Sequence, residues 1–122
     1  MATIHISVPA QAEYVGLVRS TSAHVAAQCD LTMDQIEDLR LAVNEAFAFL
    51  VDPTSDSNID ITFVVDGSTL SITLTSAHTV QEPDRNSFGW TVLSALVNEV
   101  ASSRNENGHI IIELTAMAGV SA

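Results

Sequence analysis

The chain has 122 residues, 47% of them hydrophobic, and a formal net charge of -11, since 15 acidic residues outnumber four arginines and lysine is absent. No apolar run approaches the ~20 residues that span a bilayer, and the scattered arginines do not form the basic surface that nucleic acids require, so we expect neither a membrane span nor a nucleic-acid partner. The length predicts a single domain over residues 1–122, and the lack of a signal-peptide pattern at the N-terminus predicts a cytoplasmic protein.

The first third of the chain is predicted to form a strand and two helices. Residues 3–8 (TIHISV) alternate apolar and polar side chains, as a half-buried strand does, and residues 11–29 carry apolar side chains at helical spacing. Thr32 and Gln35 then form a capping box that opens a second helix. Its apolar stripe ends before Pro53, which cannot continue a helix.

A β-hairpin between residues 59 and 75 carries the strongest turn signal in the chain. Apolar and polar side chains alternate on both sides of Asp66-Gly67, a dipeptide that accepts the positive φ of a two-residue turn. One face of the hairpin is therefore predicted to meet helices and the other to meet solvent.

The last third is predicted to form a helix and a strand. Apolar side chains at helical spacing, through Val97 and Val100, predict a helix from about Phe88 to Ser103, and residues 108–116 (GHIIIELTA) predict the final strand. The order β-α-α-β-β-α-β predicts an α+β fold, a two-layer sandwich in which helices cover one face of a mostly antiparallel sheet.

The sequence lacks the usual motifs of catalysis and metal binding. Its four histidines fall on four different predicted elements, with no ligand spacing to an acid or to Cys29, so we expect no metal site. No Walker loop, dinucleotide-binding glycine motif or nucleophile elbow is present. Cys29, the single cysteine, is predicted to be a buried, inert thiol.

Two helical sequences carry a resemblance to a known family. LTMDQIEDLRLAVNEA (residues 31–46) and SFGWTVLSALVNEV (residues 87–100), with the hairpin between them, resemble the anti-sigma-factor serine kinases, which belong to the GHKL superfamily of histidine-kinase-like ATPases. The similarity extends from about Ile4 to Leu114. It implies the histidine-kinase-like ATPase fold and a role in transcription regulation, as in a stress response.

The resemblance marks Glu45 and Phe49 as positions of a former catalytic site. In the family, the first of these helices lines an ATP pocket, with a glutamate as general base and, four residues on, an asparagine that holds Mg²⁺. Glu45 matches the glutamate and is interpreted as a vestigial general base, whereas Phe49 stands at the asparagine position and offers Mg²⁺ no oxygen ligand. Apart from the resemblance, Glu45 would be a solvated acid and Phe49 an ordinary packing residue.

Two further nucleotide motifs of the family are degenerate. The aspartate of its D-x-G-x-G motif, which binds adenine, is replaced by Ser76 or Ala77, and both glycines are missing. In the G-x-G that precedes the third helix and cradles the phosphates, Ser87 replaces the first glycine and Gly89 remains. We therefore expect neither ATP nor Mg²⁺ as a cofactor, although an active kinase would need both.

The resemblance also implies protein partners. The family holds a sigma factor away from RNA polymerase and releases it when an anti-anti-sigma protein of the STAS type docks, often as a homodimer. An acidic chain suits a basic sigma factor, and Arg19 falls at the place of a family arginine that contacts partners. A solvated helix arginine is the alternative for Arg19. The strand at residues 3–8, at or near a sheet edge, is the expected dimer contact.

Three functions fit these residues. The first is an anti-sigma factor that works by protein–protein binding, without ATP binding or kinase activity. The second is an active ATP-dependent serine kinase that phosphorylates an anti-anti-sigma protein. The third is a GHKL-fold regulatory module whose partner is not a sigma factor.

Overall fold

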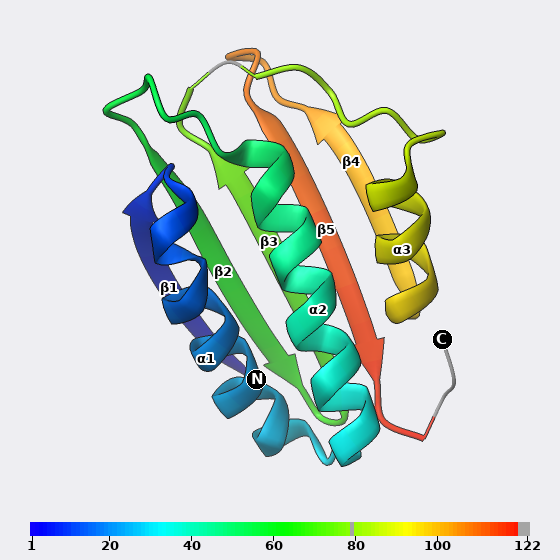
Figure 1. The fold of residues 1–122 in the computed structure, drawn as a ribbon. Coiled ribbons are helices and arrows are strands. Elements are labelled where there is room, and N and C mark those ends of the chain that lie inside the picture. The colour runs from blue at the N-terminus through cyan, green and yellow to red at the C-terminus, as the bar shows by residue number, and fades with distance from the viewer. Residues whose placement is uncertain (79, 120–122) are drawn as a thin grey trace.

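The structure is a computed structural model that describes residues 1–78 and 80–119. Helices and strands in this part of the chain are labelled in Figure 1. In chain order they are β1 (Ala2–Pro9), the 3-10 helix η1 (Ala12–Tyr14), α1 (Val15–Ala26), the 3-10 helix η2 (Ala27–Cys29), α2 (Met33–Leu50), β2 (Asn58–Asp66), β3 (Thr69–Ser76), α3 (Phe88–Leu96), β4 (Glu99–Arg104) and β5 (Ile110–Met117).

The five strands form one antiparallel sheet in the order β1-β2-β3-β5-β4. The helices α1, α2 and α3 lie side by side over one face of it, with α2 in the middle (Figure 1). This arrangement confirms the predicted α+β sandwich with helices on one face of an antiparallel sheet. The hairpin of β2 and β3 turns at Gly67 and Ser68, one residue later than predicted, because Asp66 pairs with Thr69 and Gly67 supplies the positive φ of 62°.

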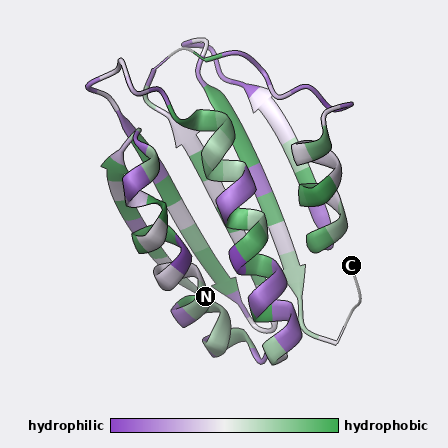
Figure 2. Cartoon of the chain, in the orientation of Figure 1, coloured by the Kyte–Doolittle hydropathy of each residue, from purple (hydrophilic) through white to green (hydrophobic). Residues whose placement is uncertain are grey.

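The hydrophobic core lies between the sheet and the helices. Alternate side chains of the three central strands are fully buried while most of their neighbours are half-buried or exposed, and Figure 2 shows the matching alternation in hydropathy. The buried set comprises Ile59, Ile61, Phe63, Leu70, Ile72, Leu74, Ile110, Ile112 and Leu114. Removing each such side chain from water contributes about 1.5–3 kcal/mol to folding.

The predicted capping box fixes the start of α2. The Gln35 amide donates to Thr32 Oγ1 at 3.1 Å, and the Thr32 amide donates to Gln35 Oε1 at 3.0 Å. Gln35 Nε2 also donates to the carbonyl of Met117 at 3.0 Å, which ties the start of α2 to the end of β5. The helix continues to Leu50, so residues 44–49 lie in its last two turns.

The structure corrects the predicted end of the third helix. The helix α3 stops at Leu96, since Val97 is extended with φ -131° and ψ 163°, and β4 takes up residues that were predicted to be helical. Along its length, from Glu99 to Arg104, β4 pairs with β5. Pairing with the edge of β5 outweighs the helical spacing of Val97 and Val100, so the observed order is β-α-α-β-β-α-β-β.

Candidate functional site

The contact between α2 and α3 brings together three of the predicted site residues. Glu45 and Phe49 stand four residues apart on α2, so they share one face of the helix. Gly89, in the first turn of α3, lies directly against them: a Cβ built on Gly89 would be 3.3 Å from Oε2 of Glu45 and 3.4 Å from Cζ of Phe49. A larger residue would compete for this space, so Gly89 allows the two helices to approach closely.

An aromatic pair closes this contact. The rings of Phe49 and Trp90 meet edge to face, with 6.1 Å between their centroids and 64° between their planes, a geometry that adds about 0.5–1.5 kcal/mol to the burial of apolar area. Trp90 is buried, Phe49 is half-buried, and the Arg85 guanidinium lies 5.6 Å from the centroid of the Trp90 ring. Phe49 therefore serves as a packing residue between α2 and α3.

Glu45 lies at the N-terminal end of α3. Ser87 is the N-cap of that helix, and its Oγ accepts the Trp90 amide at 3.2 Å. The Glu45 carboxylate, close to Gly89 two positions after the cap, is an anion where the helix dipole favours negative charge. Phosphate groups favour helix N-termini for the same reason. A carboxylate of the protein itself thus lies beside the turn that would attract a phosphate.

Ser76 lies at the end of β3 and is bonded within the sheet. Its side chain is buried, and its Oγ accepts the Ile110 amide at 3.0 Å and donates to the Ile110 carbonyl at 3.5 Å. These bonds join β3 to β5, not to α2 or α3. Ala77 is exposed, and its amide donates to the Asn58 carbonyl at 2.9 Å. Neither residue supplies a carboxylate for an adenine amino group.

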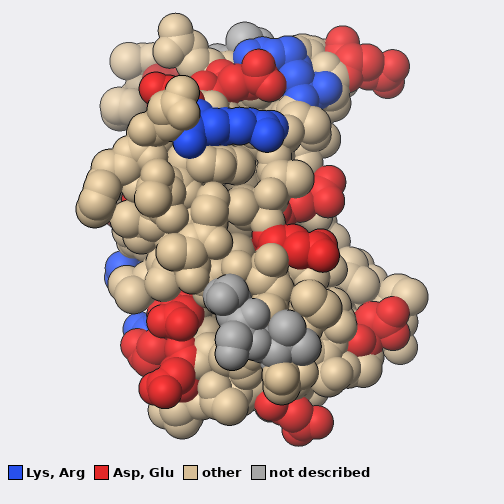
Figure 3. Space-filling view, turned by 90° about the vertical axis from the view of Figure 1, so that its right-hand side faces the viewer, with Lys and Arg blue, Asp and Glu red and all other residues tan. Residues whose placement is uncertain are grey.

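Two arginines hold the loop between β3 and α3 against β4. Arg85 Nη2 donates to the carbonyl and to Oγ of Ser102, each at 3.1 Å. Arg104 Nη1 donates to the Gly108 carbonyl at 2.6 Å, and its Nη2 donates to the Val80 carbonyl at 3.4 Å. Figure 3, viewed from the α3 side, shows basic side chains among acidic ones at this end of the molecule. Val80 and Arg85 are therefore both held by hydrogen bonds to residues of β4.

Arg19 contacts α2 on the side that faces α1. Its Nη1 donates to Oδ1 of Asn44 at 3.1 Å, and the side chain is half-buried. The bond connects α1 to α2 next to Glu45 in sequence but on another face of the helix. Arg19 thus contributes a hydrogen bond between the two helices.

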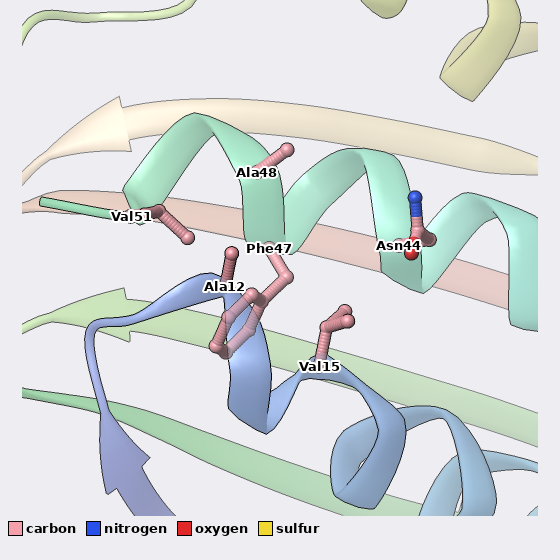
Figure 4. A pocket seen from close by; sticks show the side chains of 6 residues that line it. All are labelled: Ala12, Val15, Asn44, Phe47, Ala48 and Val51. Carbon is pink, nitrogen blue, oxygen red and sulfur yellow. The ribbon is translucent and has the colours of Figure 1, made fainter. Parts of the chain in front are cut away.

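A pocket of about 240 Å³ opens beside Asn44, between η1, the start of α1 and the second half of α2. Figure 4 shows side chains of the two helical segments facing each other across it. The residues that line it are Ala12, Val15, Asn44, Phe47, Ala48 and Val51. This pocket lies on the α1 side of α2, away from the contact with Gly89, and the sequence carried no motif for it.

The residues at the α2–α3 contact do not fit Mg²⁺ and ATP. The metal requires several oxygen ligands, whereas Phe49, at the family's ligand position, places an apolar ring beside the Glu45 carboxylate. Within residues 1–78 and 80–119, no group of three or more His, Cys, Asp or Glu side chains could hold a metal ion. In the same ranges, no helix is both long and apolar enough to cross a bilayer.

Arg85, Trp90 and Arg104 form the part of this region that sequence reasoning missed. Trp90 was visible as an apolar helix position, but its pairing with Phe49 joins segments far apart in the chain. Cys29, by contrast, is buried as predicted, and burial, aided by the charge of Asp30, raises the pKa of its thiol. A thiol with a raised pKa is a poor nucleophile.

Comparison with curated proteins connects this geometry to relatives. No family model matches the chain. The chain is similar to the serine-protein kinase RsbW of Bacillus subtilis, with 32% identity over 120 residues that cover 80% of the chain and 75% of the relative. It is also similar to the serine-protein kinase RsbW of Halalkalibacterium halodurans, with 44% identity over 54 residues that cover 44% of the chain and 33% of the relative.

A solved structure shares the fold. The crystal structure of the RsbU and RsbW domains of a Mycobacterium tuberculosis protein superimposes with a TM-score of 0.71 at 20% sequence identity, covering 96% of the chain. The chain spans about a third of that solved protein, since the match covers 32% of it. The likeness supports the two-layer arrangement of helices and sheet.

Proposed function

Because this chain belongs to the family of the serine-protein kinase RsbW, the anti-sigma factors, we propose that it sequesters a sigma factor by protein–protein binding, without ATP binding or kinase activity. Release occurs when an anti-anti-sigma protein of the STAS type docks on it. The proposal gives this chain the family's sigma-factor binding and not its kinase activity.

The single observation that carries this proposal is the filled contact between α2 and α3. Phosphoryl transfer depends on a metal that bridges the phosphates and neutralises the developing charge, and Phe49 supplies no ligand for it. Phe49 and Trp90, packed edge to face, leave no catalytic group in their place.

Charge supports a sigma factor as the partner. The net charge of -11 attracts basic proteins and speeds their encounter with the chain. Sigma factors bind nucleic acid and therefore carry basic surface. Arg19, already fixed to α2 through Asn44, offers a partner carboxylate a guanidinium in a defined position.

Titration with Mg-ATP tests the nucleotide half of the proposal. We expect no measurable heat of binding at millimolar nucleotide, and the same result with the Phe49→Asn variant would locate the block in more than one residue. Micromolar, Mg²⁺-dependent binding to the wild-type chain would restore the active serine kinase, the alternative that the retained Glu45 and Gly89 favour.

Binding assays with purified sigma factors test the partner half. Surface-immobilised chain should capture at least one sigma factor of the source cell, with the same affinity in the presence and absence of nucleotide. Capture of STAS proteins alone, with no sigma factor bound, would instead support the third function, a regulatory module of the same fold.

We further propose that two copies associate through β1. Among residues 1–78 and 80–119, β1 pairs with β2 alone, so its outer edge carries unpaired backbone groups along Ala2–Pro9. The other sheet edge is partly covered, since Arg85 donates to the Ser102 carbonyl of β4. Light scattering coupled to size exclusion should give the mass of a homodimer, and a monomer at tens of micromolar would refute the association.

A further inference from the structure

We propose that the pocket between α1 and α2 receives one large apolar side chain from a basic segment of a protein partner. This inference rests on the proposed function, in which that partner is a sigma factor, and it adds the chemistry by which the partner is recognised. It concerns the side of α2 that faces away from the family's nucleotide motifs.

The size of the pocket suits a single side chain. A cavity of about 150 Å³ is large enough to bind benzene, whereas pockets for drug-sized small molecules begin at about 300 Å³. The volume of about 240 Å³ falls between these limits. A leucine or phenylalanine side chain therefore fits, and a nucleotide does not.

The walls of the pocket are almost entirely apolar. Five of the six lining residues are Ala, Val or Phe, and Phe47, at 1% exposure, forms a rigid buried wall. The sixth, Asn44, has its Oδ1 occupied by Arg19. An apolar anchor would meet one polar lining side chain, whose Oδ1 keeps its hydrogen bond to Arg19, and burial of such an anchor is what makes an interface residue energetically dominant.

Two carboxylates and one guanidinium lie beside the pocket, since Glu13 and Asp52 adjoin lining residues in sequence and Arg19 binds Asn44. The balance of these charges is acidic and favours a basic occupant. Glu13, which is exposed, adjoins the lining residue Ala12, and Asp52 adjoins Val51. The Asp52 amide donates to the Ala10 carbonyl at 2.9 Å, which places this acid at the η1 end of the pocket. A lysine or arginine next to the apolar anchor would meet these carboxylates, in keeping with the acidic charge of the whole chain.

Three capped tripeptides test the pocket directly. In methyl NMR, acetyl-Lys-Leu-Lys-amide should shift the signals of Val15, Ala48 and Val51 saturably. Acetyl-Glu-Leu-Glu-amide should bind at least about fivefold more weakly, because like charges repel, and acetyl-Lys-Ala-Lys-amide should give no saturation. Equal shifts with all three peptides, or none with any, would overturn the proposal.

A filled pocket tests the same inference with the full partner. Ala48→Phe, at an exposed lining position, should weaken sigma-factor binding at least about tenfold, as loss of an anchoring contact does. Ala27→Phe, at an exposed alanine of η2 that does not line the pocket, is the matched control and should bind as the wild type does. Ala12→Phe fills the pocket from η1 should Ala48→Phe fail to fold.

The outcomes separate this inference from the proposed function. Wild-type binding by Ala48→Phe and Ala12→Phe would overturn the pocket while leaving sigma-factor sequestration intact. A wild-type chain that binds no sigma factor would overturn sequestration, and the tripeptides would still decide the pocket. Conversion of a dimer to a monomer by Ala48→Phe would show that a second copy fills the pocket, against the proposal.

Discussion

The two sides of α2 differ in how they are packed. On the side that faces α3, Glu45 and Phe49 pack against Gly89 and Trp90, so the positions that the family uses for catalysis form a helix–helix contact. On the side that faces α1, Phe47 lines an open apolar pocket. The comparison teaches that two flanks of one helix can differ in kind, one filled by packing and the other carrying an open apolar pocket.

The largest expected effect is on stability and comes from removing a side chain at the α2–α3 contact. Phe49→Ala removes a half-buried ring and its edge-to-face contact with Trp90. We expect the free energy of unfolding to fall by about 2–3 kcal/mol, at or slightly below the usual range for fully buried aromatics. Urea denaturation gives the value directly. An unchanged midpoint would mean that the α2–α3 contact is not closed by packing.

Charge reversal on the other side should act on binding and not on folding. Arg19→Glu should weaken sigma-factor capture about tenfold, while unfolding changes by no more than about 1 kcal/mol, the value of its one bond to Asn44. Arg40→Glu is the matched control, since Arg40 makes an exposed ion pair with Glu37 within α2. If the two variants lost sigma-factor capture equally, the loss in Arg19→Glu would be explained by the change in net charge and not by a contact of Arg19.

Adding one methyl group at Gly89 should show how closely α2 and α3 approach each other. Gly89→Ala places a Cβ 3.3 Å from Oε2 of Glu45, and such overpacking should destabilise the fold by about 1 kcal/mol. Adding Glu45→Ala should recover most of that loss, because it clears the space. Thermal unfolding of the single and double variants measures the coupling.

The control for this variant lies on the other side of α2. A Cβ built on Gly16, in α1, would be 3.8 Å from Nη2 of Arg19, an ordinary contact. Gly16→Ala should therefore stabilise the protein by about 0.5–1 kcal/mol through helix propensity. Destabilisation by both substitutions alike would show that close approach is not particular to the α2–α3 contact.

The smallest expected effect concerns the acid beside the pocket. Hydrogen bonds from the Thr54 hydroxyl and amide lower the pKa of Asp52 below its ordinary value. A lowered pKa means that the ionised form favours folding: the contribution is present above the ordinary pKa and is lost as pH falls through the native value.

Thr54→Val removes the hydroxyl donor and should raise the pKa of Asp52 toward its ordinary value, as a carboxylate-detected NMR titration between about pH 2 and 6 would measure. The variant should be less stable than the wild type above this pH range, and the difference in stability should disappear as the pH falls through it. An unshifted titration would assign the lowered pKa to other charges near the pocket.

Much of the fold was predictable because local patterns and tertiary packing agree. Thr32 and Gln35 predict the start of α2, because their capping box is complete within four residues. The hairpin is predicted by the alternation of apolar and polar side chains around Gly67. The family resemblance of the two helical sequences was also sound, as the relatives named RsbW confirm. In each case neighbouring residues carry the signal.

The predictions from sequence were wrong or incomplete where contacts between distant segments determine the structure. Val97 and Val100 suit a helix by spacing, yet pairing with β5 makes the second of them part of a strand. The contact of Glu45 with Gly89 depends on how α3 is placed against α2, and the pocket depends on how η1 lies against Val51. No window of sequence contains both partners of such a contact, so spacing alone could not predict it.

The register of β1 sets an order of events during synthesis. Ala2 pairs with Val65 and Pro9 with Asn58, so β1 cannot pair until synthesis has passed the end of β2. The segments of α1 and α2 are translated in the interval, with their apolar faces still waiting for the sheet. Long-range pairing of this kind is slow to form and leaves apolar surface exposed. Formation of the β1–β2 pair is therefore a late step in the folding of this domain.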